Sequence, residues 1–250
     1  MKFIHRCIER LAGTVVRVRT TEPLVALTFD DGPDPQGTPA LLERLAAHGA
    51  MATFFMIGKR AAEQPELVKT VHRAGHAIGN HTWDHPSLPL LSRAERRCQL
   101  RRTAEILPRQ GRMLFRPPFG HFDAPSQLDV FLCAGQAVAW SAIIPDWEGR
   151  PAAELAELAR QALHPGAILA MHDGLMDFTD ACWRDRRPTI EAVDLLLSET
   201  AGRYKFVTLP ELMRRGKPVR ACWRMAPDLE MLHRLKRADG TARRYGREPS

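Results

Sequence analysis

The sequence predicts an α/β fold, a deformed (β/α) barrel of about seven units. The chain has 250 residues, 44% of them apolar and 26% charged, and single α/β barrels commonly have this size. Apolar, β-rich runs alternate with amphipathic helical patterns, which favours parallel strands joined by helices. Polar residues suited to catalysis follow several of the strand runs, where the loops of a barrel build its active site.

The first half of the chain gives three such alternations. Val25–Phe29 is a β-rich run that ends at two aspartates, and residues 39–49 have apolar side chains at helical spacing up to Gly49. We then expect, in order, a strand at 52–58, a helix at Pro65–Ala74, a strand at 76–80, a helix at Ser92–Leu107 and a strand at 112–116.

The second half continues the pattern. The expected elements are a strand at Ala137–Ile144, a helix at Ala152–Leu163, a strand at Ala167–Met171, a helix at Ile190–Thr200 and a strand at Tyr204–Thr208. Composition changes only after about residue 213. We therefore predict an N-terminal segment at 1–22, one catalytic domain at 23–213 and a basic tail at 214–250.

The net charge of +7 lies in this tail, because residues 214–250 hold eleven Lys and Arg against four Asp and Glu. We expect a solvated tail and no nucleic-acid partner. Residues 3–11 place apolar side chains at helical spacing, so weak contact with a membrane surface through this segment or the tail is left open. The oligomeric state is also left open.

Cysteine usage and the N-terminus predict a cytoplasmic protein. The five cysteines are an odd number, stand far apart and form no CxxC pair, which is typical of thiols in a reducing compartment. Charged residues and His5 interrupt the apolar run that a secretory signal needs, and no stretch approaches the ~18 apolar residues of a membrane span.

Four segments carry candidate chemistry: TFDDGP at 28–33, NHTWDH at 80–85, RPPFG at 116–120 and ILAMHDG at 168–174. They supply adjacent carboxylates, two histidines four residues apart, an arginine beside a proline-stiffened turn and a late histidine. These are the parts needed for metal-assisted hydrolysis of an acyl group. Taken singly, each segment is equally compatible with an ordinary turn or strand end.

In this order, and with DW at 146–147, the segments resemble the polysaccharide deacetylases, carbohydrate esterase family four, which include chitooligosaccharide deacetylases. The resemblance covers about residues 23–213. It implies the deformed barrel and a metal-dependent hydrolase that removes an N-acyl group, in the first instance acetyl, from an amino sugar or glycoconjugate.

The resemblance also assigns residues. Asp31, His81 and His85 would bind one divalent ion, with zinc expected first and cobalt, nickel or iron compatible with the same ligand types. Asp30 would act as the base.

Three further residues complete the implied machinery. Arg116 would position Asp30, the Phe119 amide would help to hold the oxyanion, and His172 would protonate the departing amine. Pro117 and Pro118 have no N–H group, so the first backbone donors after Arg116 are those of Phe119 and the next residue.

Two positions depart from the family pattern. Ile143 stands where an aspartate normally orients the catalytic histidine, which puts the tuning of His172 in doubt and makes Asp146 a candidate substitute. Ala170 stands where a leucine normally borders the acetyl pocket. Because residues i and i+2 share a strand face, we expect Ala170 beside His172 and tolerance of an acyl group larger than acetyl.

The aromatic residues and the substrate leave alternatives. Trp147 and Trp83 are candidates for the substrate groove, whereas Trp140 is expected in the core. The motifs describe the reaction centre and not the groove. A deacylase of an ester or non-sugar amide, and a glycan-binding homologue without turnover, therefore both stay open.

Overall fold

The structure is a computed structural model, and it describes residues 13–108, 111–176, 184–230 and 232. The amphipathic stretch at 3–11 and the end of the basic tail lie outside the described residues. No helix in the described part of the chain combines the length and the apolar character needed to cross a bilayer.

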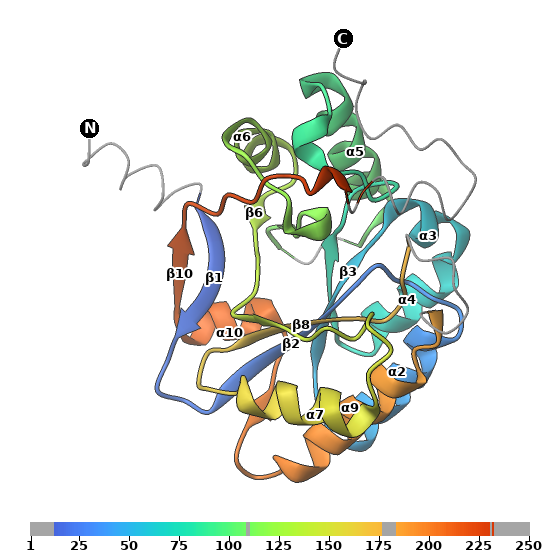
Figure 1. The fold of residues 1–250 in the computed structure, drawn as a ribbon, viewed down its shortest axis with the longest axis vertical. Helices are drawn as coiled ribbons and strands as arrows, with labels where there is room; N and C mark the ends of the chain where they lie inside the picture. The colour runs from blue at the N-terminus through green and yellow to red at the C-terminus, as the bar shows by residue number, and fades with distance from the viewer. Residues whose placement is uncertain (1–12, 109–110, 177–183, 231, 233–250) are drawn as a thin grey trace.

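Seven parallel strands form a curled sheet, which confirms the predicted barrel-like fold as a half-barrel (Figure 1). β2 (Leu24–Asp30) is paired on both sides and is buried along its whole length. The order across the sheet is β6 (Gln136–Ala137), β5 (Leu114–Phe115), β4 (Ala77–Asn80), β3 (Ala52–Met56), β2 (Leu24–Asp30), β8 (Ile168–His172) and β7 (Ala142–Ile143), and β9 (Lys205–Phe206) pairs with the start of β2.

The predicted strand at Ala137–Ile144 is wrong, because this stretch crosses from one edge of the sheet to the other. β6 pairs with β5, whereas β7 pairs with β8 at the opposite edge. Between them, the Ala139 amide donates to Val15 O and the Ser141 amide to Ile168 O, at 2.8 and 2.9 Å. The crossing brings the two edges near each other and curls the sheet.

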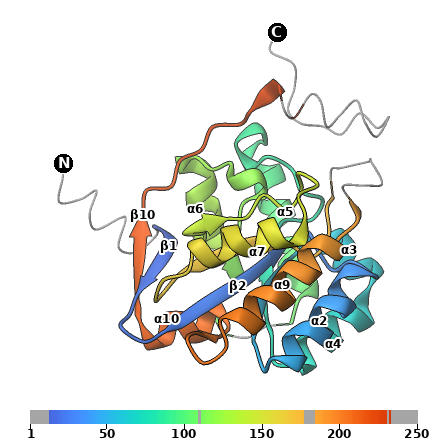
Figure 2. The ribbon, with the colours of Figure 1, turned by 60° about the horizontal axis from the view of Figure 1, so that its bottom comes forward.

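Most helices of the main core pack on one face of the sheet, whereas Leu209 and Leu212 of the last helix pack against the other face. The expected helices appear as α2, α4, α5, α7 and α9, whereas α3, α6 and α10 were not predicted. Figure 2 shows α7, α9 and α2 side by side. The helices are α2 (Gly37–Ala47), α3 (Gly58–Glu63), α4 (Pro65–Arg73), α5 (Arg93–Ile106), α6 (Ala124–Cys133), α7 (Ala152–Gln161), α9 (Arg187–Glu199) and α10 (Leu209–Arg215), with short 3₁₀ turns η1 (Leu88–Leu90) and η2 (Pro118–Gly120).

Local sequence explains the start of α5 and its packing on α6. Ser92 and Glu95 form a capping box, in which each side chain accepts a hydrogen bond from the other's backbone amide. The buried Asp129 of α6 then accepts from Arg96 and Arg97 of α5, at 2.9 and 2.8 Å. These bonds hold the two helices against each other.

The folded domain is larger than predicted at both ends. β1 (Thr14–Arg19) pairs antiparallel with β10 (Lys217–Ala221), so the expected boundaries at 22/23 and 213/214 leave this two-stranded sheet outside the domain. The hydrophobic core includes Val15 and Val18 of β1. Charge alone marked residues 214–221 as tail, but the basic side chains leave the strand backbone free to pair.

Gly166 lies in the turn before β8, against the edge of β1. Its φ is +83°, its carbonyl accepts from Val18 N, and a Cβ there would lie 1.7 Å from Val18 O. We expect Gly166→Ala to lower the free energy of unfolding in urea by about 2–4 kcal/mol. Gly202 has a similar φ of +75° with open space around it, so Gly202→Ala should cost only about 1 kcal/mol. Equal losses in the two variants would contradict this reading of the turn.

Candidate active site

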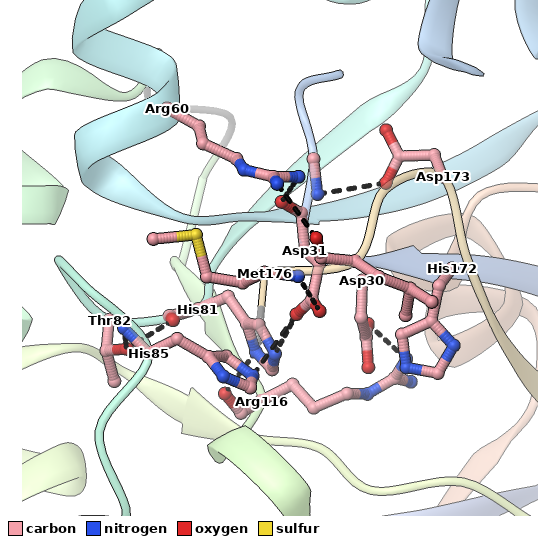
Figure 3. Close-up of polar contacts among 12 residues, drawn as sticks. Asp30, Asp31, Arg60, His81, Thr82, His85, Arg116, His172, Asp173 and Met176 are labelled. Atoms are coloured by element: carbon pink, nitrogen blue, oxygen red, sulfur yellow. Dashed lines mark hydrogen bonds and ion pairs between the residues drawn. The ribbon is translucent and has the colours of Figure 1, made fainter. Parts of the chain in front are cut away.

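The site lies where four parallel strands end. Asp30 is the last residue of β2 and pairs in register with His172, the last residue of β8. His81 follows β4 directly, and Arg116 follows β5. Because the carboxyl ends of parallel strands meet at one edge of the sheet, side chains far apart in the sequence converge (Figure 3).

Asp31, His81 and His85 form a buried three-ligand cluster. The Nε2 atoms of His81 and His85 lie 3.3 and 3.2 Å from Asp31 Oδ1, and one potential ligand atom from each residue lies within 4.8 Å of the others. Asp31 Oδ1 is buried and makes no hydrogen bond. A buried carboxylate oxygen without a donor, facing two imidazole nitrogens, fits a divalent metal ion.

Hydrogen bonds fix these ligands in forms that suit a metal. His81 Nδ1 lies 2.8 Å from Arg116 O, so Nδ1 carries the proton and Nε2 presents its lone pair toward Asp31. Burial alone would raise the pKa of Asp31, but His85 and His81 hold that pKa well below its usual range. Asp31 is therefore an anionic ligand, and its Oδ2 accepts from the Met176 amide at 3.1 Å.

The backbone around the cluster is strained. Asp31, Thr82, His85 and Phe119 are the non-glycine residues with positive φ in the described chain, at 74°, 68°, 63° and 56°. Such conformations cost on the order of 1–3 kcal/mol each, and surrounding contacts must hold them. Arg60 of α3 supplies one, because its guanidinium donates to Asp31 O at 3.0 Å and to Leu175 O at 2.9 Å. Sequence analysis missed Arg60.

Arg116 anchors Asp30 inside the half-barrel. Its Nη1 donates to Asp30 Oδ1 at 2.8 Å and to Thr28 Oγ1 at 2.6 Å, and its Nη2 donates to Ala139 O at 3.0 Å. The guanidinium is fully buried, with the Phe55 ring centroid 4.2 Å away. Arg116 therefore lies behind Asp30 and out of solvent, in contact with the carboxylate that it was expected to position.

Asp146 supplies the carboxylate that Ile143 lacks. His172 Nδ1 lies 2.7 Å from Asp146 Oδ1, and the His172 amide donates to Asp146 Oδ2. Thr189 also donates to this carboxylate, at 3.1 Å. Burial alone would lower the pKa of His172, but Asp146, with smaller contributions from Asp31 and Asp30, raises it to about 9. The departure at Ile143 therefore leaves His172 paired and protonated at neutral pH.

Asp173 is a structural neighbour of the site. Its carboxylate accepts from the Gly32 amide at 3.1 Å and from Thr38 Oγ1 at 2.5 Å, and burial raises its pKa to about 7. A Cβ on Gly32 would lie 2.0 Å from Asp173 Oδ2, so only glycine fits there. Asp173 thus ties β8 to the turn that carries Asp31.

The candidate metal ligands, Asp30 and His172 border one cavity of about 480 Å³. Trp147 borders it and meets the His172 ring edge-on at 5.4 Å. Trp140 also borders it, so its expected place in the core is wrong; the crossing after β6 turns its ring to the cavity. The lining residues are Asp30, Asp31, His81, His85, Pro117, Phe119, Gly120, His121, Trp140, Ile143, Trp147, His172, Leu175, Met225, Ala226 and Asp228.

Two predicted substrate residues do not reach this cavity. Ala170 lies two residues before His172 in β8, is fully buried, and pairs with Thr28 and Ile143. It does not border the cavity, so its small side chain does not enlarge the space beside His172. Trp83 turns toward α5, where the Arg102 guanidinium lies 3.5 Å from the ring centroid. Neither Ala170 nor Trp83 therefore borders the cavity, as the expected larger acyl pocket and the expected groove role would each require.

Sequence comparison agrees with the resemblance. A family model described as polysaccharide deacetylase matches residues 17–131. A peptidoglycan-N-acetylglucosamine deacetylase of Bacillus cereus is 34% identical over 198 residues, covering 77% of this chain and 69% of the relative. A chitooligosaccharide deacetylase of Azorhizobium caulinodans is 35% identical over 208 residues, covering 82% and 95%.

Solved structures share the fold. A peptidoglycan N-acetylglucosamine deacetylase, crystallised with a hydroxamate-type benzamide, superposes with a TM-score of 0.74 at 31% identity, covering 85% of this chain and 97% of the other. A protein from Bacillus anthracis described as a pseudoenzyme of carbohydrate esterase family four superposes with a TM-score of 0.71 at 26% identity, covering 82% and 70%. By sequence and by fold, the chain belongs to the polysaccharide deacetylases of carbohydrate esterase family four.

Proposed function

We propose that the protein uses a zinc ion to hydrolyse the N-acetyl group of an amino-sugar unit in a glycan or glycoconjugate. One observation carries the proposal. The three-ligand cluster, the ion-paired Asp30 and the carboxylate-bound His172 border a single cavity. A base, an acid and a metal site around one space are the requirements of acyl hydrolysis.

Asp30 is placed to take a proton from the attacking water. A divalent ion held by Asp31, His81 and His85 would supply a Lewis acid for the acyl carbonyl and lower the pKa of a water molecule. The Asp30 carboxylate is 4% exposed and borders the cavity, while Arg116 fixes its orientation from below. One of its oxygens is thereby engaged, so the other can face the water.

The amide of Phe119 is the donor we assign to the oxyanion. Within the RPPFG turn, the Gly120 amide donates to Pro117 O and the His121 amide to Pro118 O, both at 3.0 Å. The sequence offered two backbone donors after Arg116, the amides of Phe119 and Gly120. The Gly120 amide is already bonded within the turn, which leaves the Phe119 amide as our assignment. A fixed donor aimed at developing negative charge contributes strongly to rate because it needs no reorganisation during the reaction.

His172 is placed to protonate the departing amine. Asp146 binds its Nδ1, so Nε2 carries the proton that can be donated into the cavity. Trp147 packs on the ring and limits its movement. An amine is a poor leaving group until it is protonated, which makes this donor more important for an amide than for an ester.

The names of the relatives support an N-acetyl amino sugar over the alternatives of an ester or a non-sugar amide. The pseudoenzyme among the structural neighbours shows that this fold alone does not secure turnover. Here the cluster, Asp30 and His172 are all in place, which favours an active enzyme over a glycan binder. Cytoplasmic location and weak membrane contact stay predictions.

Asp30→Asn tests the base. We expect kcat for acetate release from chitooligosaccharides to fall by about 10²–10⁴, because the amide cannot accept the proton. Metal content should not change, since Asp30 is outside the ligand cluster. Asp194→Asn, at an exposed ion pair with His48, is the matched control and should keep wild-type kcat. Full activity in Asp30→Asn would remove Asp30 from the mechanism.

Metal removal tests the cluster. We expect purified protein to hold about one zinc per chain, a chelator to abolish acetate release, and added zinc to restore it. His85→Ala should lose both metal and turnover, whereas His164→Ala, at an exposed histidine, should keep both. Elemental analysis of each sample gives its metal content. If the protein still turned over any substrate of a broad acyl panel after complete metal removal, the proposal would be contradicted.

Asp146→Asn tests the acid. A general acid must be protonated, so kcat should fall as pH rises through the pKa of His172. Removing the Asp146 charge takes away the largest contribution that raises this pKa, against burial, which lowers it. We therefore expect the basic limb of the kcat–pH profile to move down by about one to three pH units. An unmoved limb in a variant whose melting temperature and metal content match the wild type would show that another group is the acid.

A further inference from the structure

One side of the cavity is built by the chain after β10. We name residues Trp223–Asp228 the C-terminal wall. Met225, Ala226 and Asp228 of this wall border the same cavity as Asp30 and His172. Figure 1 shows this part of the chain, in red, running from β10 across the upper half of the molecule past α6. Its charge and position had placed it in a solvated tail.

Hydrogen bonds and ring contacts fix the C-terminal wall on the RPPFG turn. The backbones of Phe122 and Met225 exchange two hydrogen bonds, of 2.9 and 3.1 Å. Trp223 Nε1 donates to Gly120 O at 2.9 Å, and its ring meets the Trp140 ring edge-on at 5.3 Å. The wall is therefore attached to the loop that presents the Phe119 amide.

Met225 presents apolar surface at the edge of the cavity. It is 40% exposed, and a Cβ built on Gly120 would lie 3.0 Å from its sulfur and 2.8 Å from the Trp140 ring. The thioether and the indole thus form one continuous apolar surface over Gly120. Unbranched, polarisable methionine adapts its shape to a bound partner, and aromatic rings pack well on the C–H faces of sugars.

We propose that Met225, together with Trp140, is a specificity-determining surface that binds a sugar ring of the glycan. The inference rests on the proposed deacetylation and deepens it, because it names the side chain that holds the carbohydrate rather than the reacting acetyl group. Met225 takes no part in proton transfer. Its contact is made in the ground state and the transition state alike, so its loss weakens binding and leaves the chemical step unchanged.

Steady-state kinetics on tri-N-acetylchitotriose test this role. In Met225→Ala we expect KM to rise roughly three- to tenfold, from the lost apolar contact, with kcat within about twofold of the wild type. The backbone bonds to Phe122 survive this substitution. Leu229→Ala is the matched control, because Leu229 is apolar, 55% exposed and outside the cavity lining. An unchanged KM in Met225→Ala, or an equal change in Leu229→Ala, would overturn the inference.

A second measurement does not depend on turnover. The nine methionines are labelled with ¹³C at the methyl group, and the Met225 signal is assigned by its absence in Met225→Ala. Adding tri-N-acetylchitotriose to zinc-loaded protein should shift this signal, and an unshifted signal at saturating sugar would refute the contact. A shift without acetate release would instead contradict the proposed deacetylation while leaving the C-terminal wall as a sugar-binding surface.

Discussion

The buried guanidinium of Arg116 is the interaction on which the site depends. Its side chain ties Asp30 to the interior of the half-barrel and binds Ala139 O in the crossing that brings the sheet edges together. Its own carbonyl sets the tautomer of His81. Removing one member of a buried ion pair costs about 3–5 kcal/mol, because the other charge is left without a partner. Asp30, His81 and the segment that curls the sheet therefore all depend on the same residue.

Contacts around the site hold its strained residues in their conformations. Four left-handed conformations at Asp31, Thr82, His85 and Phe119 each place a side chain or amide where an ordinary turn would not. Their cost is offset by contacts away from the cavity, such as the Arg60 bonds to the backbone of Asp31 and Leu175. The site is thus held in place before substrate binds, which is the condition for effective electrostatic catalysis.

Much of the reaction centre could be predicted from the sequence, because it follows strand ends. The strand β2 ends at Asp30, and β8 ends at His172, so an apolar run followed by polar residues indicated where these side chains lie, whereas their roles came from the resemblance of the ordered motifs. The helices α2, α4 and α7 were also predictable from apolar periodicity. Parallel pairing then made convergence of these residues a consequence of the fold class.

The rest depended on where the chain turns, which periodicity does not encode. The run at 137–144 has the composition of one strand, but it crosses the open side of the sheet and exposes Trp140 to the cavity. Asp146 lies just after this crossing, three residues beyond Ile143, and its carboxylate binds His172. Met225 enters the site through an isolated antiparallel bridge to Phe122, a residue far from it in the sequence, which no local pattern indicates.

Anomalous diffraction at the zinc edge, from zinc-loaded crystals, locates the bound ion and so tests the proposed zinc site. We expect one strong peak among Asp31, His81 and His85, about 2.0–2.2 Å from a carboxylate oxygen and from both Nε2 atoms, with Asp30 and His172 facing the same cavity. A zinc peak at another location, with Asp31 Oδ1 hydrogen-bonded directly to the two imidazoles, would contradict it.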